Sequence, residues 1–272
     1  MKHSDLGVLN GDLLLFGGPY SNAQATTALF AQATKLGVAA DHLICTGDVV
    51  AYCAGAAATV DAVRAAGCVV VAGNCEVQLA QNADGCGCGF DAGSTCDLLS
   101  VAWYAYARAQ LDDVARDWMA RLPDVVTFTH HGRRYGVIHG GATDVARFIW
   151  QTDGSAVFDE EWDALERLVG PVDCVVAGHS GLPFMRQTTR GLWVNTGVIG
   201  MPPHNGAAQT HYAVLSGGKV AIHDLTYDVP EAMAHMEAAG LPSEYRCALN
   251  SGYWPSEDVL PDALRMAVSD RG

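Results

Sequence analysis

The sequence has little positive charge and no long hydrophobic run. Its 272 residues include 16 Lys and Arg against 30 Asp and Glu, giving a formal net charge of -14. The basic residues form no run beyond the pair Arg133 and Arg134, so we expect no contact with nucleic acid or an anionic membrane. No apolar stretch approaches the roughly 18 residues that a membrane span needs. Small molecules and proteins remain as partners, including a second copy of the chain in a homodimer.

The beginning of the sequence also lacks a secretion signal. The stretch MKHSDLGVLNGD contains no hydrophobic core and no small-residue cleavage site, so we expect a cytoplasmic protein. The nine cysteines are an odd number, and Cys45, Cys68 and Cys174 lie in apolar runs typical of strands. A disulfide framework is therefore not expected, and buried free thiols account for most of the cysteines.

Apolar runs alternate with amphipathic stretches along the chain. The pattern predicts strands at DLLLFGG, HLICTGD and CVVVAGN, separated by helices over residues 22–36 and 56–66. Residues 75–97 are rich in Gly, Asp and Asn, which predicts a long loop. Helices near 98–110 and 113–122 follow, and then six short strand-like runs with one helix over about 160–169. Strands that follow strands in the second half predict two facing mixed β-sheets flanked by helices.

The length of the chain favours one domain with a short appendage. We assign residues 1–226 to this domain and residues 227–272 to a C-terminal tail packed on it. The tail is predicted to be helical over PEAMAHMEAAG and irregular afterwards, where prolines recur.

Four predicted strand ends finish in a polar side chain beside a glycine. These side chains are Asp48, Asn74, His139 and His179. Glycine lets the backbone turn sharply, so its neighbours are expected to point into one crevice at the carboxyl edge of the sheet. A carboxylate, an amide oxygen and two imidazoles form a ligand set suited to a divalent transition metal such as Mn, Fe or Zn.

The order of these groups resembles the calcineurin-like metallophosphoesterases, and within them the small bacterial phosphodiesterase and diadenosine-tetraphosphatase-like branch. The family pattern is Asp-x-His, Gly-Asp, Gly-Asn-His-Asp/Glu, a His before Gly, and Gly-His-x-His. The corresponding stretches here are GPY at 18–20, GDVVAY at 47–52, GNCE at 73–76, HGG at 139–141 and GHSG at 178–181. The resemblance spans about residues 12–225. It implies the family's four-layer α/β/β/α sandwich.

The resemblance also implies a metal centre, because the family holds two metals that share one Asp. All ligands of one metal are present, at Asp48, Asn74, His139 and His179. The positions of the other metal's own ligands carry Gly18, Tyr20 and Gly181 instead. The implied cofactor is therefore one divalent metal, Mn, Fe or Zn, at a remodelled centre, and a second metal is in doubt.

Three further positions are candidates for substrate contact or catalysis. Cys75 replaces the family His that contacts the substrate phosphate or protonates the leaving group, which makes it a candidate catalytic residue beside Asp48 and Asn74. Tyr20 could supply a phenolate ligand to iron, hydrogen-bond a phosphate, or fill the space of the lost metal. Asn74 is a further candidate for binding the substrate. His204 lies where relatives often carry a basic residue near the substrate.

The predicted loop contains three more cysteines, Cys86, Cys88 and Cys96. Their thiolates could fold back and bind iron, zinc or an iron–sulfur cluster. The alternative is that they are free thiols, packed or on the surface.

Together these features predict a metal-dependent hydrolase with reduced or altered activity. Its substrate would be a small phosphomonoester, phosphodiester or nucleotide. One alternative is a catalytically silent family member that binds a phosphorylated ligand or a partner protein. Another is a thiol-rich metal or redox protein on the same scaffold, with Cys75 and the loop cysteines as ligands.

Overall fold

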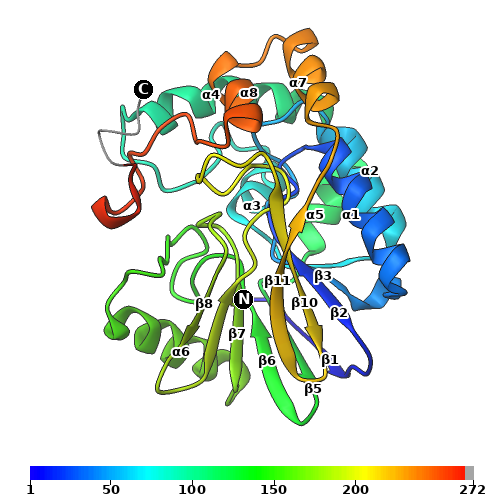
Figure 1. Cartoon of the computed structure of the whole chain (residues 1–272), viewed down its shortest axis with the longest axis vertical. Coiled ribbons are helices and arrows are strands. Elements are labelled where there is room, and N and C mark those ends of the chain that lie inside the picture. Colours follow the sequence, from blue (N-terminus) through cyan, green and yellow to red (C-terminus); the bar gives the residue numbers. More distant parts are fainter. Residues whose placement is uncertain (267–272) are drawn as a thin grey trace.

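Two β-sheets lie face to face in the computed structural model, which describes residues 1–266 (Figure 1). The six-stranded sheet has the spatial order β1 (His3–Val8), β5 (Val125–His130), β6 (Arg133–Val137), β7 (Cys174–Ala177), β9 (Leu192–Asn195) and β8 (Phe184–Gln187). The five-stranded sheet has the order β11 (Lys219–Leu225), β10 (Thr210–Ser216), β2 (Leu13–Phe16), β3 (Leu43–Cys45) and β4 (Val69–Val70). Both sheets are mixed, because parallel and antiparallel pairs occur in each.

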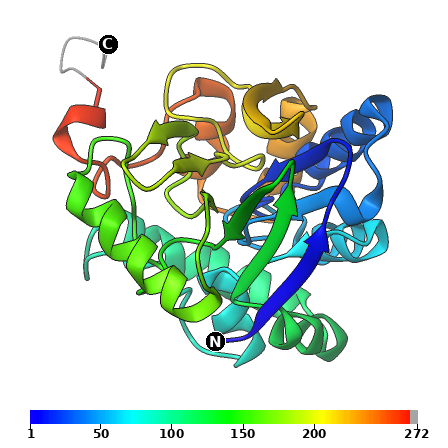
Figure 2. The same ribbon diagram turned by 90° about the horizontal axis from the view of Figure 1, so that it is seen from below.

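Helices cover the outer faces of both sheets (Figure 2). The six-stranded sheet packs against α6 (Ser155–Val169), which buries Phe158 and Trp162 against Trp193. The five-stranded sheet packs against α1 (Ala23–Leu36) and α2 (Ala56–Ala66). The order of layers is therefore helix, sheet, sheet, helix, as predicted.

Strand β2 shows why its sequence is apolar throughout. Leu13 and Leu15 belong to the core between the two sheets, whereas Leu14 and Phe16 belong to the core under the helices. Successive side chains of a strand point to opposite faces. A strand covered on both faces therefore has no polar side to present.

The prediction of an uninterrupted loop over residues 75–97 is wrong at both ends. Helix α3 spans Asn74–Ala80, and α4 begins earlier than predicted and spans Thr95–Gln110. The buried Glu76 carboxylate accepts the backbone N–H of Gly73 at 3.0 Å, which caps the first turn of α3. Leu79 is fully buried on the same helix, so packing outweighs the weak periodicity of this segment.

Other elements differ from the prediction in smaller ways. Helix α5 (Asp113–Arg121) lies where it was expected, but the helix predicted from about 160 begins at Ser155. Strands β1 and β8 were not predicted, because each has a mixed polar sequence and few buried side chains.

The C-terminal segment lies over one end of the five-stranded sheet and its helices. Helix α7 (Val229–Ala238) was predicted, but the segment after it was wrongly expected to be irregular, because α8 spans Ser243–Ser251. Tyr245 and Leu249 of α8 are buried. Beyond α8 the chain runs to the left edge of the molecule in Figure 1. The predicted tail extends to residue 272, so its last six positions lie outside the described residues. None of the helices within residues 1–266 has the length and apolar character to cross a membrane.

Replacing Asn22 by alanine is expected to lower the free energy of unfolding by about 1–2 kcal/mol. Its side-chain oxygen caps α1 by accepting the N–H of Ala25 at 3.0 Å, and its amide group donates to the carbonyl of Gly200 at 3.1 Å. Ser94→Ala is a matched comparison, because Ser94 caps α4 through one longer hydrogen bond of 3.2 Å. Denaturant unfolding should show a smaller loss for Ser94→Ala, and equal losses would contradict the role of the Gly200 contact.

Candidate metal centre

Four buried polar side chains meet at one edge of the sandwich. Three of them follow the ends of strands, and the fourth begins a helix. Asp48 follows β3, Asn74 begins α3, His139 follows β6 and His179 follows β7. Asp48 and His179 have left-handed backbones, with φ angles of 54° and 58°. This conformation is uncommon for residues other than glycine and often marks functional sites. The sequence analysis predicted all four as metal ligands, and the fold brings them together.

The four side chains direct hydrogen-bond acceptors at one another. His139 Nδ1 lies 2.6 Å from the carbonyl oxygen of Thr46, so Nδ1 donates and Nε2 carries a lone pair in the neutral ring. His139 Nε2 lies 3.1 Å from Asn74 Oδ1, 3.1 Å from His179 Nδ1 and 3.2 Å from Asp48 Oδ2. Oxygen and nitrogen lone pairs so close together are stabilised by a bound cation.

The described residues contain one cluster of three or more His, Cys, Asp or Glu side chains with ligand atoms all within 4.8 Å of one another. It consists of Asp48, His139 and His179. Burial and the neighbouring His139 lower the pKa of His179 to about 3, so its imidazole is neutral at pH 7. Burial opposes ionisation of Asp48, but His139 and His179 lower its pKa below the ordinary value. Burial lowers the pKa of His139, but the Asp48 carboxylate outweighs it and raises that pKa above the usual value, so this ring shares a proton with Asp48 in the metal-free site. A divalent ion would displace that proton, and a carboxylate with two imidazoles is a donor set that fits such an ion.

The loop after α3 orients the amide of Asn74. Its nitrogen donates to the carbonyl of Cys86 at 3.0 Å and approaches Cys88 Sγ at 3.3 Å, which turns its oxygen toward His139. Cys86 and Cys88 thus fix the direction of a ligand oxygen, and metal binding by the thiols of Cys86, Cys88 and Cys96 stays a prediction. Such outer contacts tune metal affinity.

The buried thiol of Cys75 is held in its neutral form. A hydrogen bond from Cys88 favours the thiolate, but burial and the Asp48 carboxylate raise the pKa of Cys75 well above its usual value. Its backbone N–H donates to Asp48 Oδ1 at 3.3 Å. Cys75 therefore supports Asp48 through its backbone, and a catalytic role for its thiol stays a prediction.

Glu76 is the last residue of the GNCE motif, and the sequence analysis did not predict a role for it. Its carboxylate is fully buried and accepts four backbone N–H groups. The donors are Asp48 at 2.8 Å, Val49 at 2.9 Å, Val50 at 3.3 Å and Gly73 at 3.0 Å. Glu76 thus holds the strained turn that carries Asp48 against the turn that carries Asn74. Its position two residues after Asn74 is the sequence feature that could have predicted this role.

The three positions where the family's other metal would have its own ligands are filled by packed groups. A Cβ atom on Gly18 would lie 2.5 Å from Val198 Cγ1 and 2.8 Å from the ring of Tyr20. A Cβ atom on Gly181 would lie 3.1 Å from the indole ring of Trp254. Burial raises the pKa of Tyr20 well above its usual value, so its phenol is neutral. Aromatic rings therefore line this space, and none of the three positions carries a carboxylate or an imidazole.

The loop after β2 still supports the centre through its backbone. Tyr20 donates its N–H to the carbonyl of Asp48 at 3.1 Å, and Gly18 donates to Gly47 at 3.0 Å. This loop has lost ligand side chains but keeps the Asp48 turn in place.

His204 was predicted to bind substrate, but the structure places it behind the pocket that adjoins the centre. Its Nδ1 accepts the backbone N–H of Trp254 at 2.9 Å, and its Nε2 lies 2.9 Å from a carboxylate oxygen of Glu257. Both ring nitrogens are used within the protein, so His204 positions the C-terminal segment. A direct contact with substrate stays untested.

The sandwich and its buried Asp–His cluster define the metallophosphoesterase class of fold. The crystal structure of a metallophosphoesterase from Sphaerobacter thermophilus has a TM-score of 0.69 and 18% identity, covering 90% of this chain and 100% of that chain. A hypothetical protein from Pyrococcus horikoshii OT3 has a TM-score of 0.71 and 17% identity, with the same coverage. No curated protein matches the chain.

Residues 21–218 match the model of the calcineurin-like phosphoesterase superfamily domain. The chain therefore belongs to the calcineurin-like phosphoesterase superfamily, as its motifs predicted. Members of this family are generally metal-dependent hydrolases, and the Asp48 cluster provides a candidate metal site.

Proposed function

We propose that the protein is a phosphoesterase that hydrolyses a small phosphomonoester, phosphodiester or nucleotide at a mononuclear metal centre. Asp48, Asn74, His139 and His179 would hold the ion. The observation that carries the proposal is the convergence of their acceptor atoms around His139 Nε2 within 3.2 Å. A divalent ion would supply Lewis acidity toward a phosphoryl oxygen and lower the pKa of a water molecule.

The protein's own groups define how such a site would work. Asp48 contributes the negative charge, while the Thr46 carbonyl fixes the tautomer of His139. Tyr20 and Trp254 line the neighbouring space where the family holds its other metal, and neither offers that ion a carboxylate or imidazole. Hydrolysis at one ion is expected to be slower than at a two-ion site, which clamps both the attacking and the leaving oxygen.

Metal binding and ester hydrolysis test the proposal together. Protein purified without chelators is expected to carry about one equivalent of Mn, Fe or Zn, by analogy with mononuclear sites, and to hydrolyse 4-nitrophenyl phosphate or bis(4-nitrophenyl) phosphate. Elemental analysis and release of 4-nitrophenol measure the two properties. Metal binding without hydrolysis of either ester would favour a silent, ligand-binding member of the family. Absence of metal and hydrolysis would contradict the proposal.

A homodimer stays a prediction, and analytical ultracentrifugation would test it.

A further inference from the structure

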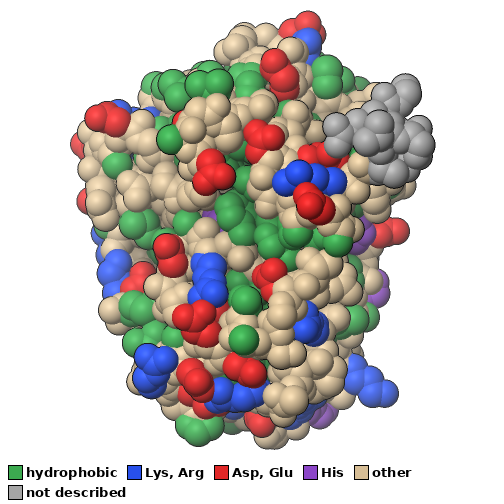
Figure 3. Space-filling view, turned by 90° about the vertical axis from the view of Figure 1, so that its left-hand side faces the viewer, with side chains coloured by type: hydrophobic (Ala, Val, Ile, Leu, Met, Phe, Trp, Pro, Cys, Tyr) green, Lys and Arg blue, Asp and Glu red, His purple; other side chains and the backbone are tan. Residues whose placement is uncertain are grey.

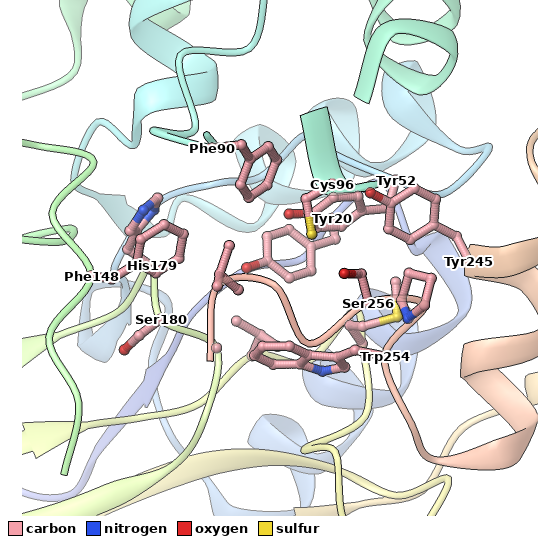
Figure 4. A pocket seen from close by; sticks show the side chains of 15 residues that line it. Tyr20, Tyr52, Phe90, Cys96, Phe148, His179, Ser180, Tyr245, Trp254 and Ser256 are labelled. Carbon is pink, nitrogen blue, oxygen red and sulfur yellow. The ribbon is translucent and has the colours of Figure 1, made fainter. Parts of the chain in front are cut away.

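An aromatic pocket adjoins the candidate metal centre through His179. Its cavity volume is about 60 Å³, and the pocket opens to solvent at its mouth. Fifteen residues, all from the described part of the chain, line it. Figure 4 shows His179 and Phe148 on one side, Tyr52 and Tyr245 on the other, and Trp254 below. The ring of Phe148 lies 4.4 Å from that of His179, so the pocket continues directly from a candidate metal ligand.

The pocket wall is aromatic and uncharged. None of its lining residues is Lys, Arg, Asp or Glu. Tyr52 contacts Tyr20 with ring centroids 4.7 Å apart and stacks on Tyr245, also at 4.7 Å. Flat rings at such spacings favour a flat aromatic guest through edge and face contacts. A phosphate group would find no cation here to pair with.

The C-terminal segment holds the floor of this pocket in place. The indole N–H of Trp254 donates to the carbonyl of Pro202 at 2.7 Å, and its backbone N–H donates to His204 at 2.9 Å. Asp258, farther along the segment, accepts the backbone N–H of Thr95 at 2.9 Å. The ring is therefore fixed before any ligand arrives, which reduces the entropy cost of binding.

A hollow with hydrophobic side chains lies on one face of the molecule (Figure 3). Figure 3 shows hydrophobic side chains gathered in a hollow in the middle of the face that lies to the left in Figure 1. Charged side chains surround this hollow. On that same side of the molecule lie the loop after α3 and the end of the described chain.

We infer that this pocket binds the aromatic ester group of a phosphate ester whose phosphoryl group lies at the Asp48 centre. The inference rests on the proposed function for the position of the phosphoryl group alone. The uncharged wall excludes polyphosphate from the pocket, and its aromatic composition selects a ring over a short alkyl chain. The C-terminal segment thus determines substrate specificity through Trp254 and Tyr245.

Binding of two phosphonates that are not hydrolysed tests the inference. Benzylphosphonate and ethylphosphonate carry the same charged group, and the benzyl compound is expected to bind at least about 10-fold more tightly. Isothermal titration of the protein supplied with Mn²⁺ measures both constants. Trp254→Leu is expected to remove most of this preference, whereas Trp118→Leu, which changes a half-buried indole on α5, should keep it.

A second variant tests the same pocket in case Trp254→Leu does not fold. Val259→Trp adds bulk at a lining position without removing an anchor, and it should weaken benzylphosphonate binding more than ethylphosphonate binding. Equal binding of the two phosphonates, or no binding of benzylphosphonate, would overturn the inference even if the enzyme hydrolyses phosphate esters. A benzyl preference that Trp254→Leu removes would uphold the pocket even if no ester is hydrolysed.

Discussion

Replacing Asp48 by asparagine is expected to weaken Mn²⁺ binding by at least about 100-fold, because the only carboxylate of the candidate ligand set is lost. The substitution preserves shape. Asparagine adopts the left-handed backbone found at Asp48, where φ is 54°, as readily as aspartate does. Its side-chain oxygen can still accept the N–H of Cys75, which lies 3.3 Å from Asp48 Oδ1. The loss should therefore reflect charge rather than misfolding.

Hydrolysis of a phosphate ester should fall by a similar factor in Asp48→Asn if it depends on the same centre. The control is Asp117→Asn, which removes an exposed carboxylate on α5. Metal titration, steady-state kinetics and thermal unfolding of the metal-free proteins would separate binding, rate and folding. Unchanged metal affinity in a folded Asp48→Asn protein would remove Asp48 from the ligand set.

Replacing Glu76 by alanine should lower the free energy of unfolding by about 3–5 kcal/mol. Its carboxylate accepts four backbone N–H groups in the interior, and alanine would leave all four donors without this partner. Glu76→Gln should cost less. One oxygen of Glu76 accepts from Val49 and Val50 and the other from Asp48 and Gly73, so an amide can satisfy one pair and opposes the other.

Urea unfolding in the presence of a chelator measures this effect without a contribution from bound metal. Glu244→Ala changes an exposed glutamate in α8 and should stay within about 0.5 kcal/mol of the parent protein. A loss for Glu76→Ala as small as that of Glu244→Ala would mean that water replaces the carboxylate. If Glu76→Gln leaves the free energy of unfolding unchanged, one accepting oxygen at this position is sufficient.

The ligand positions were predictable because local sequence and topology point to the same edge. A polar residue beside glycine at a strand end is a local signal, and parallel strands bring such ends together. Gly73 shows the reason for the pairing, since a Cβ atom there would collide with the carboxylate of Asp48. The layers were predictable for a similar reason, because β2 is apolar on both faces.

The pocket was beyond the reach of the same reasoning. Trp254 lies in an irregular segment with no periodicity, and its neighbour Gly181 is distant in sequence. Such contacts depend on where the chain crosses after α8, which no local pattern encodes. Helix α3 was missed because its seven residues are too short for a periodic signal, and the capping by Glu76 decides its formation.

The C-terminal segment contributes part of the pocket wall but none of the candidate metal ligands. The candidate metal ligands come from the ends of strands and the start of α3, whereas Tyr245 and Trp254 come from the chain after residue 226. Substitutions in the chain after residue 226 would alter the shape of the ligand that fits the pocket. They would leave the candidate metal ligands unchanged. Related chains with the same four ligands and unrelated C-terminal segments would then diverge in substrate range without any change in chemistry.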